Sequence, residues 1–407
     1  MPATSSNVVY MDNHATTRVD PRVVAAMLAY FDEHYGNAHS VHAMGHDARN
    51  AVDMARAQVA AAIGAEAKEI VFTSGATESN NLAIRGVAER ERRRGNHLVS
   101  VATEHKAVLD PLARLGRRGY EVELLGVEQF GSPRAGWLDP QSVAEALRDD
   151  TCLVSVMLAN NEIGVIQPLA EIAAICRKRG VLVHCDATQA VGKTPLDVAA
   201  LGVDLMSFTA HKIYGPKGIG ALYIRRRVPI VRLEPQIVGG GQQEGRRGGT
   251  LNVSGIVGFA EALRLCIDEL PQEMVRLAAL RDQLAAALFE RLDDLLLCGP
   301  ALDLNYDDGT PLRLPGNLNL SFGNVDGEAL LLAMGNLAVS SGAACTSTDP
   351  GPSHVLRAIG LSEEAARSSL RFGLGRFNDA ADVDFAVDRV VQAVGNLRSL
   401  AGTRSMG

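Results

Sequence analysis

Two short apolar segments of this 407-residue chain end in side chains that could do chemistry. One ends at Asp186, and the other runs through Thr209 and His211 to Lys212. A carboxylate at the end of a buried strand needs a partner such as a protonated ring nitrogen, because an uncompensated buried charge is costly. A lysine that its surroundings deprotonate can form a Schiff base with an aldehyde. The plainer alternatives are a helix-capping aspartate and a solvated loop lysine, and the latter fits Lys217 better.

The scarcity of lysine narrows the search for such an amine. The chain holds 40 Lys and Arg residues, of which only six are lysine. Lys212 therefore has few rivals for any chemistry that needs a primary amine.

Two further segment ends complete this set. The first, FTSGATESNN at 72–81, joins a predicted strand to a helix start, where free backbone N–H groups and the helix dipole favour an anion. Thr77 could add a hydroxyl, although an ordinary capped helix start has a similar sequence. The second carries His105, whose imidazole could stack on a flat cofactor. A phosphate cradle, a buried aspartate, a lysine and a flat ring partner together indicate a pyridoxal phosphate site.

These segment ends belong to a predicted α/β domain. Between about residues 20 and 225, apolar strand patterns alternate with helical ones, which indicates a mostly parallel sheet covered by helices on both faces. In open sheets of this kind, ligands bind beyond the carboxyl ends of the strands. A Gly-Pro-Lys-Gly turn before the last strand makes an antiparallel exception possible there. The seven predicted strands are 69–73, 97–102, 120–125, 152–158, 181–185, 204–208 and 219–224.

A smaller α+β domain is predicted in the C-terminal part. A glycine-rich segment at 239–249 precedes a long helical pattern from about 253 to 292, which we expect to break or kink near Pro271. A second cycle of strands and helices follows. We therefore assign 15–265 to a large cofactor-binding domain, and 1–14 together with 266–407 to the small domain.

Composition and charge exclude several classes of protein. With 47% hydrophobic and 21% charged residues, the chain has the composition of an ordinary globular protein. The formal net charge of −7 argues against direct nucleic-acid binding as its main task. The sequence shows neither an apolar run of about 18 residues nor a signal-peptide pattern, so we expect no membrane span. Its six cysteines form no CxxC pair, which predicts no metal site of its own and favours a reducing cytoplasm.

Seven motifs carry a family resemblance that covers nearly the whole chain. They are FTSGATESNN at 72–81, TEHKAVL at 103–109, ANNEIG at 159–164, HCDATQAVGK at 184–193, AHKIYGPKGIGALY at 210–223, GRRGGT at 245–250 and SSGAACTS at 340–347. The chain resembles the pyridoxal-phosphate-dependent cysteine desulfurases of the class V aminotransferase superfamily. Within them it resembles the group with the longer active-site loop that acts in iron–sulfur cluster assembly. The resemblance implies the fold-type I architecture of these transferases.

The resemblance assigns roles around the cofactor. It implies that Lys212 bears pyridoxal phosphate, that Asp186 holds the pyridinium, and that His105 stacks on the ring. Gln189 would reach the phenolic oxygen. The other cofactor-binding residues would be Ala76, Thr77, Thr209 and His211 at the phosphate, with Asn161.

The resemblance also assigns roles to residues around the substrate and a second subunit. Asn161 and Arg371 match the residues that hold the substrate carboxylate, a task that suits a bidentate arginine. In the family, a threonine at the place of Thr250 reaches the phosphate across a dimer interface, which implies a homodimer. His14 stands where we expect other polar residues, and it receives no role.

Cys345 receives the central role in sulfur transfer. Small, turn-forming residues surround it, as expected of an exposed loop, whereas the other five cysteines lie in or beside apolar segments and are expected to be buried. In the implied reaction L-cysteine becomes L-alanine, and its sulfur passes as a persulfide on Cys345 to an iron–sulfur scaffold or another acceptor protein. His105 is the candidate acid/base. Cys345 could also transiently ligate an iron–sulfur cluster shared with a scaffold.

Three other functions stay open at this stage. One is a different pyridoxal phosphate activity, such as an aminotransferase or a selenocysteine lyase, and another is a non-enzymatic sulfur carrier. The hypothesis of a nicotinamide-binding protein is weaker, because the glycines lack GxGxxG spacing.

The protein that accepts the sulfur could belong to nitrogen fixation, housekeeping cluster assembly or tRNA thiolation. The chain ends at Gly407 without the longer tail by which housekeeping relatives engage their scaffold, so scaffold docking is an open expectation.

Overall fold

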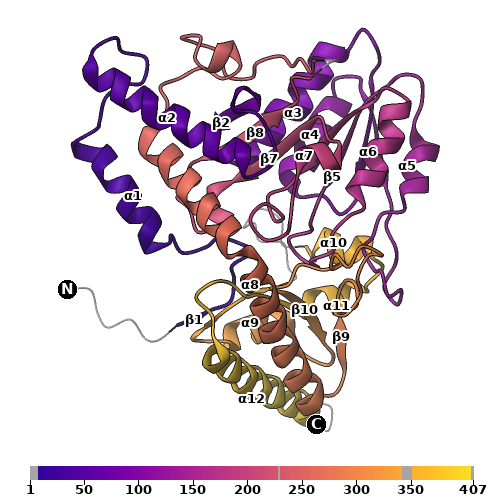
Figure 1. Cartoon of the computed structure of the whole chain (residues 1–407). Helices are drawn as coiled ribbons and strands as arrows, with labels where there is room; N and C mark the ends of the chain where they lie inside the picture. Colours follow the sequence, from indigo (N-terminus) through magenta and orange to yellow (C-terminus); the bar gives the residue numbers. More distant parts are fainter. Residues whose placement is uncertain (1–7, 228–229, 342–350, 405–407) are drawn as a thin grey trace.

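A seven-stranded sheet forms the centre of the larger part of the molecule, in a computed structural model that describes residues 8–227, 230–341 and 351–404 (Figure 1). The strand order is β2-β8-β7-β6-β5-β3-β4. All neighbours are parallel except β8, which is antiparallel to β2 and β7. The predicted mostly parallel sheet and its exception are thus confirmed. The strands are β2 (Ile70–Thr73), β3 (His97–Val101), β4 (Glu121–Leu125), β5 (Thr151–Met157), β6 (Leu182–Asp186), β7 (Leu205–Thr209) and β8 (Gly220–Ile224).

Helices cover both faces of this sheet. Leu98, Leu153 and Leu205 belong to one buried cluster with side chains of α3 (Ala76–Glu91) and α4 (Lys106–Gly116). The next residues along the same strands, such as Val154 and Met206, belong to the cluster of the opposite face. Because both sets are buried, these strands have continuous apolar sequences. The opposite face is covered by α2 (Ala43–Ala61), α5 (Pro140–Ala146), α6 (Leu169–Lys178) and the first half of α8 (Val253–Arg291), and α7 (Val198–Leu201) follows β6.

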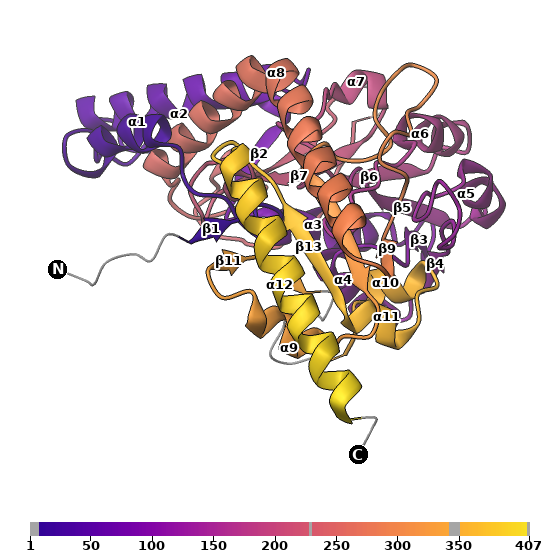
Figure 2. The same ribbon diagram turned by 90° about the horizontal axis from the view of Figure 1, so that it is seen from below.

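The two N-terminal helices pack against the first half of α8 and extend to one side of the molecule (Figure 2). They are α1 (Pro21–Asp32) and α2. Asp20 caps α1 by accepting a hydrogen bond from the backbone N–H of Arg22, and Pro21 fits the first helical position. Several large apolar side chains on and after α1 are exposed, namely Val24, Leu28, Phe31 and Tyr35.

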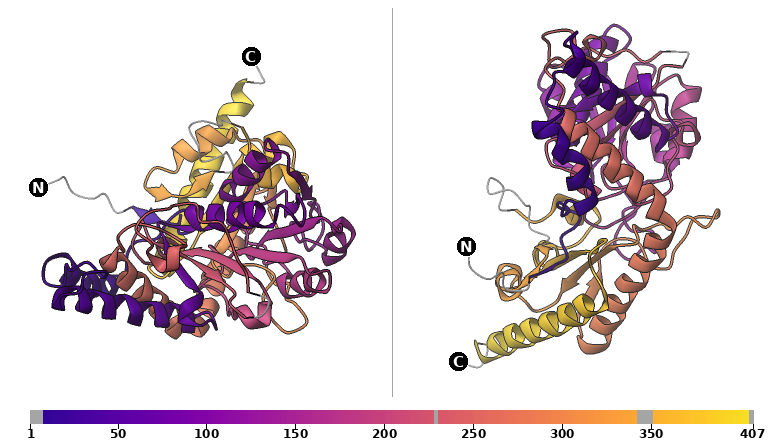
Figure 3. Two further views of the ribbon diagram at one scale, coloured as in Figure 1. Left: turned by 90° about the horizontal axis from the view of Figure 1, so that it is seen from above. Right: turned by 60° about the vertical axis from the view of Figure 1, so that its left-hand side comes forward.

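A smaller four-stranded antiparallel sheet lies in the C-terminal part, covered by α12 and the second half of α8 (Figure 3). Its strands, in spatial order, are β12 (Ser340–Ser341), β13 (Ser369–Gly373), β10 (Asn317–Phe322) and β9 (Leu295–Leu297). A short parallel pair, β1 (Val9–Tyr10) with β11 (Leu337–Ala338), ties the N-terminal segment to this part. The predicted small α+β region is therefore present. Its helices are α9 (Gly327–Ala333), α10 (His354–Ala358), α11 (Glu363–Arg367) and α12 (Ala380–Arg404).

Helix α8 corrects one expectation. It runs for 39 residues as one helix with Pro271 inside it, so of the break or kink that we expected near this proline, the break does not occur. Phe259 and Leu263 in its first half belong to the core of the large sheet, and Leu284 and Leu288 in its second half belong to the core of the small sheet. Burial at both ends offsets the cost of an interior proline, which is about 3 kcal/mol. The domain boundary that we propose near residue 265 falls within this helix.

No helix in the described part of the chain combines the length and the apolar character that crossing a membrane requires.

Candidate active site

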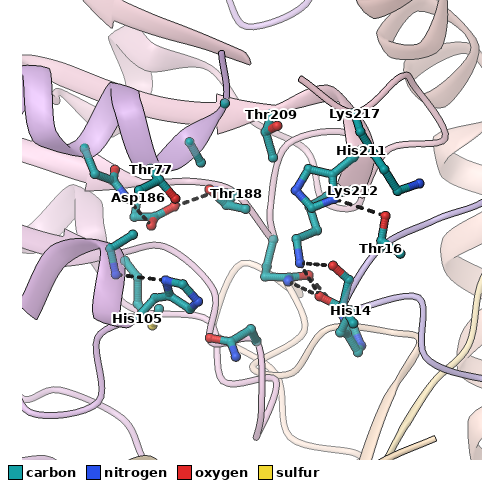
Figure 4. A pocket seen from close by; sticks show the side chains of 18 of the residues that line it. His14, Thr16, Thr77, His105, Asp186, Thr188, Thr209, His211, Lys212 and Lys217 are labelled. Carbon is teal, nitrogen blue, oxygen red and sulfur yellow. Dashed lines mark hydrogen bonds between the residues drawn. The ribbon is translucent and has the colours of Figure 1, made fainter. Parts of the chain in front are cut away.

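A cavity of about 610 Å³ lies beyond the carboxyl ends of β2, β5, β6 and β7. Its wall also includes the start of α3, the segment from His14 to Thr16, and Arg371 of β13. Figure 4 shows side chains from these separate segments facing one space. Of the residues assigned from the sequence, those that line the cavity are Ala76, Thr77, His105, Asn161, Asp186, Gln189, Thr209, His211, Lys212 and Arg371.

The two other residues assigned from the sequence are Thr250 and Cys345. Thr250 is exposed in the loop before α8 and does not line the cavity. Cys345 lies outside the described residues, in the stretch between Ser341 and Gly351. Lys217, which we interpreted as a solvated loop lysine, is exposed but does line the cavity.

The start of α3 lies at one end of the cavity. Its N-cap is Gly75, which has no side chain to cap the helix, so the backbone N–H groups of the first turn keep no helical partner. Gly75 has φ +155°, a conformation that L side chains rarely adopt, and a Cβ on Gly220 would come within 2.7 Å of its Cα. Arg247 offsets the charge of Glu78 in this turn, because its Nε donates to Oε1 at 2.8 Å. Oriented N–H groups and the helix dipole favour a bound anion here.

Asp186 ends β6 and is only 4% exposed. Its Oδ2 accepts a hydrogen bond from Asn80 Nδ2 at 2.8 Å, and its Oδ1 accepts from the backbone N–H of Thr188 at 3.0 Å. The two donors fix the plane of the carboxylate. Glu104 is fully buried nearby, and burial together with the charge of Asp186 raises its pKa well above the ordinary value. The neutral form of Glu104 is thus favoured beside Asp186.

Lys212 lies at the end of a short 3-10 turn, Ala210–Lys212, directly after β7. Its Nζ donates to the main-chain oxygens of His14 at 2.5 Å and Ala15 at 2.6 Å (Figure 4). In the same turn, His211 Nδ1 meets Thr16 Oγ1 at 3.2 Å. Burial and the charge of Lys212 lower the pKa of His211 to about 4. The N-terminal segment therefore holds the lysine at the cavity wall.

His105 follows β3 as the N-cap of α4. Its Nδ1 accepts a hydrogen bond from the backbone N–H of Ala107 at 3.0 Å, so in the neutral ring the proton lies on Nε2. Desolvation in the cavity lowers the pKa of His105. A neutral imidazole with a defined tautomer therefore faces the cavity.

Arg371 joins three segments on the other side of the cavity. Its Nη2 donates to Asp12 Oδ1 at 2.8 Å and to Ser340 Oγ at 2.9 Å, and its Nη1 donates to the main-chain oxygen of Asn161 at 2.9 Å. Its Nε is buried and has no partner among the described residues. Ser340 belongs to β12, the strand that leads into the stretch containing Cys345.

The five described cysteines are all buried, as expected. Burial raises the pKa of Cys152 and of Cys176 to about 12, which keeps both as thiols. These side chains behave as small apolar groups of the core.

Sequence reasoning missed Asn80, Glu104 and the main-chain oxygens of His14 and Ala15. Asn80 had a usable signal, because it is a polar residue on the helix face that carries the buried Ala83, Ile84 and Val87. Glu104 stood beside His105 without a feature to distinguish it. A main-chain oxygen leaves no mark on residue type, so the contacts of Lys212 could not be inferred.

The comparisons with known proteins agree with one another. The family described as aminotransferase class-V matches residues 9–385. The cysteine desulfurase IscS of Anaeromyxobacter dehalogenans is 54% identical over 97% of this chain and 94% of that protein, and IscS of Neisseria meningitidis serogroup A is 50% identical over the same shares. Among solved structures, a NifS-like protein has a TM-score of 0.86 at 36% identity, covering 96% of this chain and 100% of its own. SspA in complex with cysteine has a TM-score of 0.75 at 35% identity, covering 90% and 98%.

Proposed function

The chain belongs to the class-V aminotransferase family and, within it, to the cysteine desulfurases, and from this premise we propose that it converts L-cysteine to L-alanine with pyridoxal phosphate as cofactor. We further propose that it passes the sulfur, as a persulfide on Cys345, to an acceptor protein for iron–sulfur cluster assembly. The observation that carries the proposal is that Lys212, Asp186 and the start of α3 face one cavity. A primary amine, a fixed carboxylate and an anion-binding helix start are the groups that this cofactor requires.

The residues present fit pyridoxal phosphate. The uncapped N-terminus of α3, with Ala76, Thr77, Thr209 and His211, would hold the phosphate, and Lys212 would bear the aldehyde carbon. We assign the pyridinium to Asp186, the phenolic oxygen to Gln189 and the ring face to His105. When bound, the cofactor supplies a conjugated ring that takes up electron density from the substrate's α-carbon.

Three residues of the chain are assigned to holding or moving protons in this reaction. Asp186, held by Asn80 and by the backbone N–H of Thr188, would keep a proton on the ring nitrogen. Once released, the Lys212 amine is the group that would move the α-proton, since it lies at the cavity wall on main-chain acceptors. His105, with its proton on Nε2, is the second candidate acid/base.

The substrate carboxylate is assigned to Arg371 and Asn161. The buried Nε of Arg371 has no hydrogen-bond partner among the described residues, so the guanidinium keeps a donor for a carboxylate. Sulfur transfer would follow when the Cys345 thiolate attacks the substrate sulfur. A sulfur–sulfur bond forms, the carbon–sulfur bond breaks, and its electron pair goes to the substrate carbon, which takes a proton to give alanine. Cys345 stands five positions after Ser340, which accepts a hydrogen bond from Arg371, so at most about 18 Å of chain joins the two residues.

We propose that the enzyme works as a homodimer in the cytoplasm. Leu28 is 59% exposed, Phe31 63% and Tyr35 66%, so the α1 region presents a group of large apolar side chains that a second copy would cover. Thr250 would then reach the phosphate of the partner's site, as the family resemblance implies. Free, buried thiols are typical of a reducing compartment. An iron–sulfur scaffold is the proposed partner, and Cys345 could transiently share a cluster with it.

Product analysis tests the proposed function. The purified protein, loaded with pyridoxal phosphate, should release alanine from L-cysteine in an amount equal to the sulfur that it passes to a thiol acceptor. Lys212→Ala should lose the cofactor's colour, and Cys345→Ala should keep the colour but lose the persulfide. If Cys345→Ala transferred sulfur at the wild-type rate, the desulfurase assignment would be wrong. Faster turnover of L-selenocysteine than of L-cysteine would favour the lyase instead.

A further inference from the structure

Gln189 is held by three hydrogen bonds at the cavity wall. Its Oε1 accepts from Lys193 Nζ at 2.8 Å and meets His14 Nδ1 at 3.0 Å. Its Nε2 donates to the main-chain oxygen of His14 at 2.8 Å. We call Lys193, Gln189 and His14 the Gln189 cluster.

These contacts permit only one orientation of the Gln189 amide. The Nζ of Lys193 can only donate when charged, and the main-chain oxygen of His14 can only accept. If the amide turned over, its N–H group would face the ammonium of Lys193, and its oxygen would face the main-chain oxygen of His14. The oxygen side therefore faces Lys193, and one hydrogen of Nε2 is left for a ligand in the cavity that Gln189 lines.

The same contacts fix the tautomer of His14. Because Oε1 only accepts, Nδ1 of His14 carries the proton. Nε2 is buried and has no partner among the described residues, and the residue is 3% exposed. Burial first, then the charges of Lys193, Arg371 and Lys212, hold the pKa of His14 well below its ordinary value. His14 is thus a neutral donor to Gln189.

We propose that His14 and Lys193 are positioning residues that fix the Gln189 amide with its N–H side toward the bound cofactor, so that it donates to the phenolic oxygen. This inference rests on the proposed function, in which Gln189 reaches that oxygen. A fixed donor favours the anionic form of the oxygen, whereas an amide free to turn would also present its own oxygen to it. The cluster therefore sets the protonation state of the cofactor through the Gln189 amide.

A pH titration of the absorption spectrum of the loaded enzyme tests this, because the band of the bound cofactor reports protonation around its phenolic oxygen. His14→Phe removes the donor to Oε1, so the amide can turn and present its oxygen to the phenolic oxygen, and the midpoint should rise by about one pH unit. His14→Asn places an amide N–H near the position of Nδ1 and should restore the wild-type midpoint. For Lys193 the test variant is Lys193→Met. Its matched control is Lys178→Met, on the exposed side of α6, which should leave the midpoint unchanged.

Lys193 needs a second pair of variants, because it also contributes charge. Lys193→Met removes both the donor and the charge, whereas Lys193→Gln keeps an uncharged donor. If Lys193 acts by orienting Gln189, the shift of the midpoint should be larger for Lys193→Met than for Lys193→Gln. Equal shifts for the two variants would mean that only its charge matters, and its positioning role would be wrong.

A Gln189→Ala background decides whether His14 acts through Gln189. There, His14→Phe should cause no further shift. An equal shift with and without Gln189, or no shift in either background, would overturn the proposal. Circular dichroism checks that each variant folds, and His14→Ala takes the place of His14→Phe if the larger ring prevents folding. A wild-type protein that binds no pyridoxal phosphate would instead refute the proposed function.

Discussion

Glu104→Gln should change how the stability of this protein depends on pH. Glu104 is fully buried, its Oε1 accepts the backbone N–H of Met157, and its Oε2 has no partner among the described residues. Burial and the charge of Asp186 raise the pKa of this carboxyl well above its ordinary value. Folding therefore takes up a proton at any pH between the pKa of the unfolded chain, about 4.3, and the raised pKa of the folded one.

The sign and size of the effect follow from that proton. Within this window the stability contributed by neutral Glu104 is complete at low pH and falls as the pH rises, by about 1.4 kcal/mol per pH unit. Glutamine has the same shape and an N–H donor but no proton to lose, so Glu104→Gln lacks this term. The free energy of unfolding of the variant, minus that of the wild type, should therefore increase by about 1.4 kcal/mol from about pH 5 to about pH 6.

Urea unfolding of the two proteins at matched pH values measures this difference. Glu290→Gln, an exposed position near the end of α8, is the control and should follow the wild-type curve. If the curves of the wild type and Glu104→Gln ran parallel, Glu104 would carry its charge in the folded protein. Asp186 would then not be the principal anion beside the cavity, and its proposed role at the pyridinium nitrogen of the cofactor would be wrong.

Three further predictions concern separate parts of the molecule. Arg371→Lys loses the paired donors to the substrate carboxylate and should raise KM for L-cysteine about 10- to 100-fold in steady-state kinetics, so an unchanged KM would exclude the assigned role. Gly75→Val forces a β-branched residue into φ +155° and should speed cofactor loss during dialysis, whereas Gly395→Ala, where a Cβ meets open space, should not. Leu284→Ala, at a fully buried position in α8, should lower the free energy of unfolding by about 2–5 kcal/mol in a urea titration, and a loss below about 1 kcal/mol would contradict its place in the small core.

The large sheet could be predicted because its strands carry their burial in their own sequence. β5 and β7 are buried along their whole length, so an apolar run sufficed to place them. The path of α8 through Pro271 could not be predicted, because the packing that offsets the proline comes from two distant cores. Likewise, β9 and β1 are short strands with little sequence signal of their own, and the partner of β1, β11, lies near the other end of the chain.

The candidate site also has a part that could be predicted from the sequence and a part that could not. Asp186 and Lys212 could be placed at strand ends because a buried charge and a rare amine stand out in a sequence. The contacts that orient them come from Asn80, 106 residues before Asp186, and from His14, 198 residues before Lys212. Such partners are set by the fold, since any polar side chain or main-chain oxygen at that place would serve.

The scarcity of lysine does not by itself select Lys212, because three of the six lysines gather around one cavity. Lys212 and Lys217 line it, and Lys193 lies behind Gln189. Lys217 is exposed, and Lys193 does not reach the cavity wall. Burial first, then the neighbouring charge of Lys212, lowers the pKa of Lys193 to about 7. Among these three lysines, Lys212 alone combines a place on the wall with hydrogen bonds to main-chain oxygens. Lys217 and Arg371 also line the cavity and add positive charge there in a chain of net charge −7, which suits a phosphate and a substrate carboxylate.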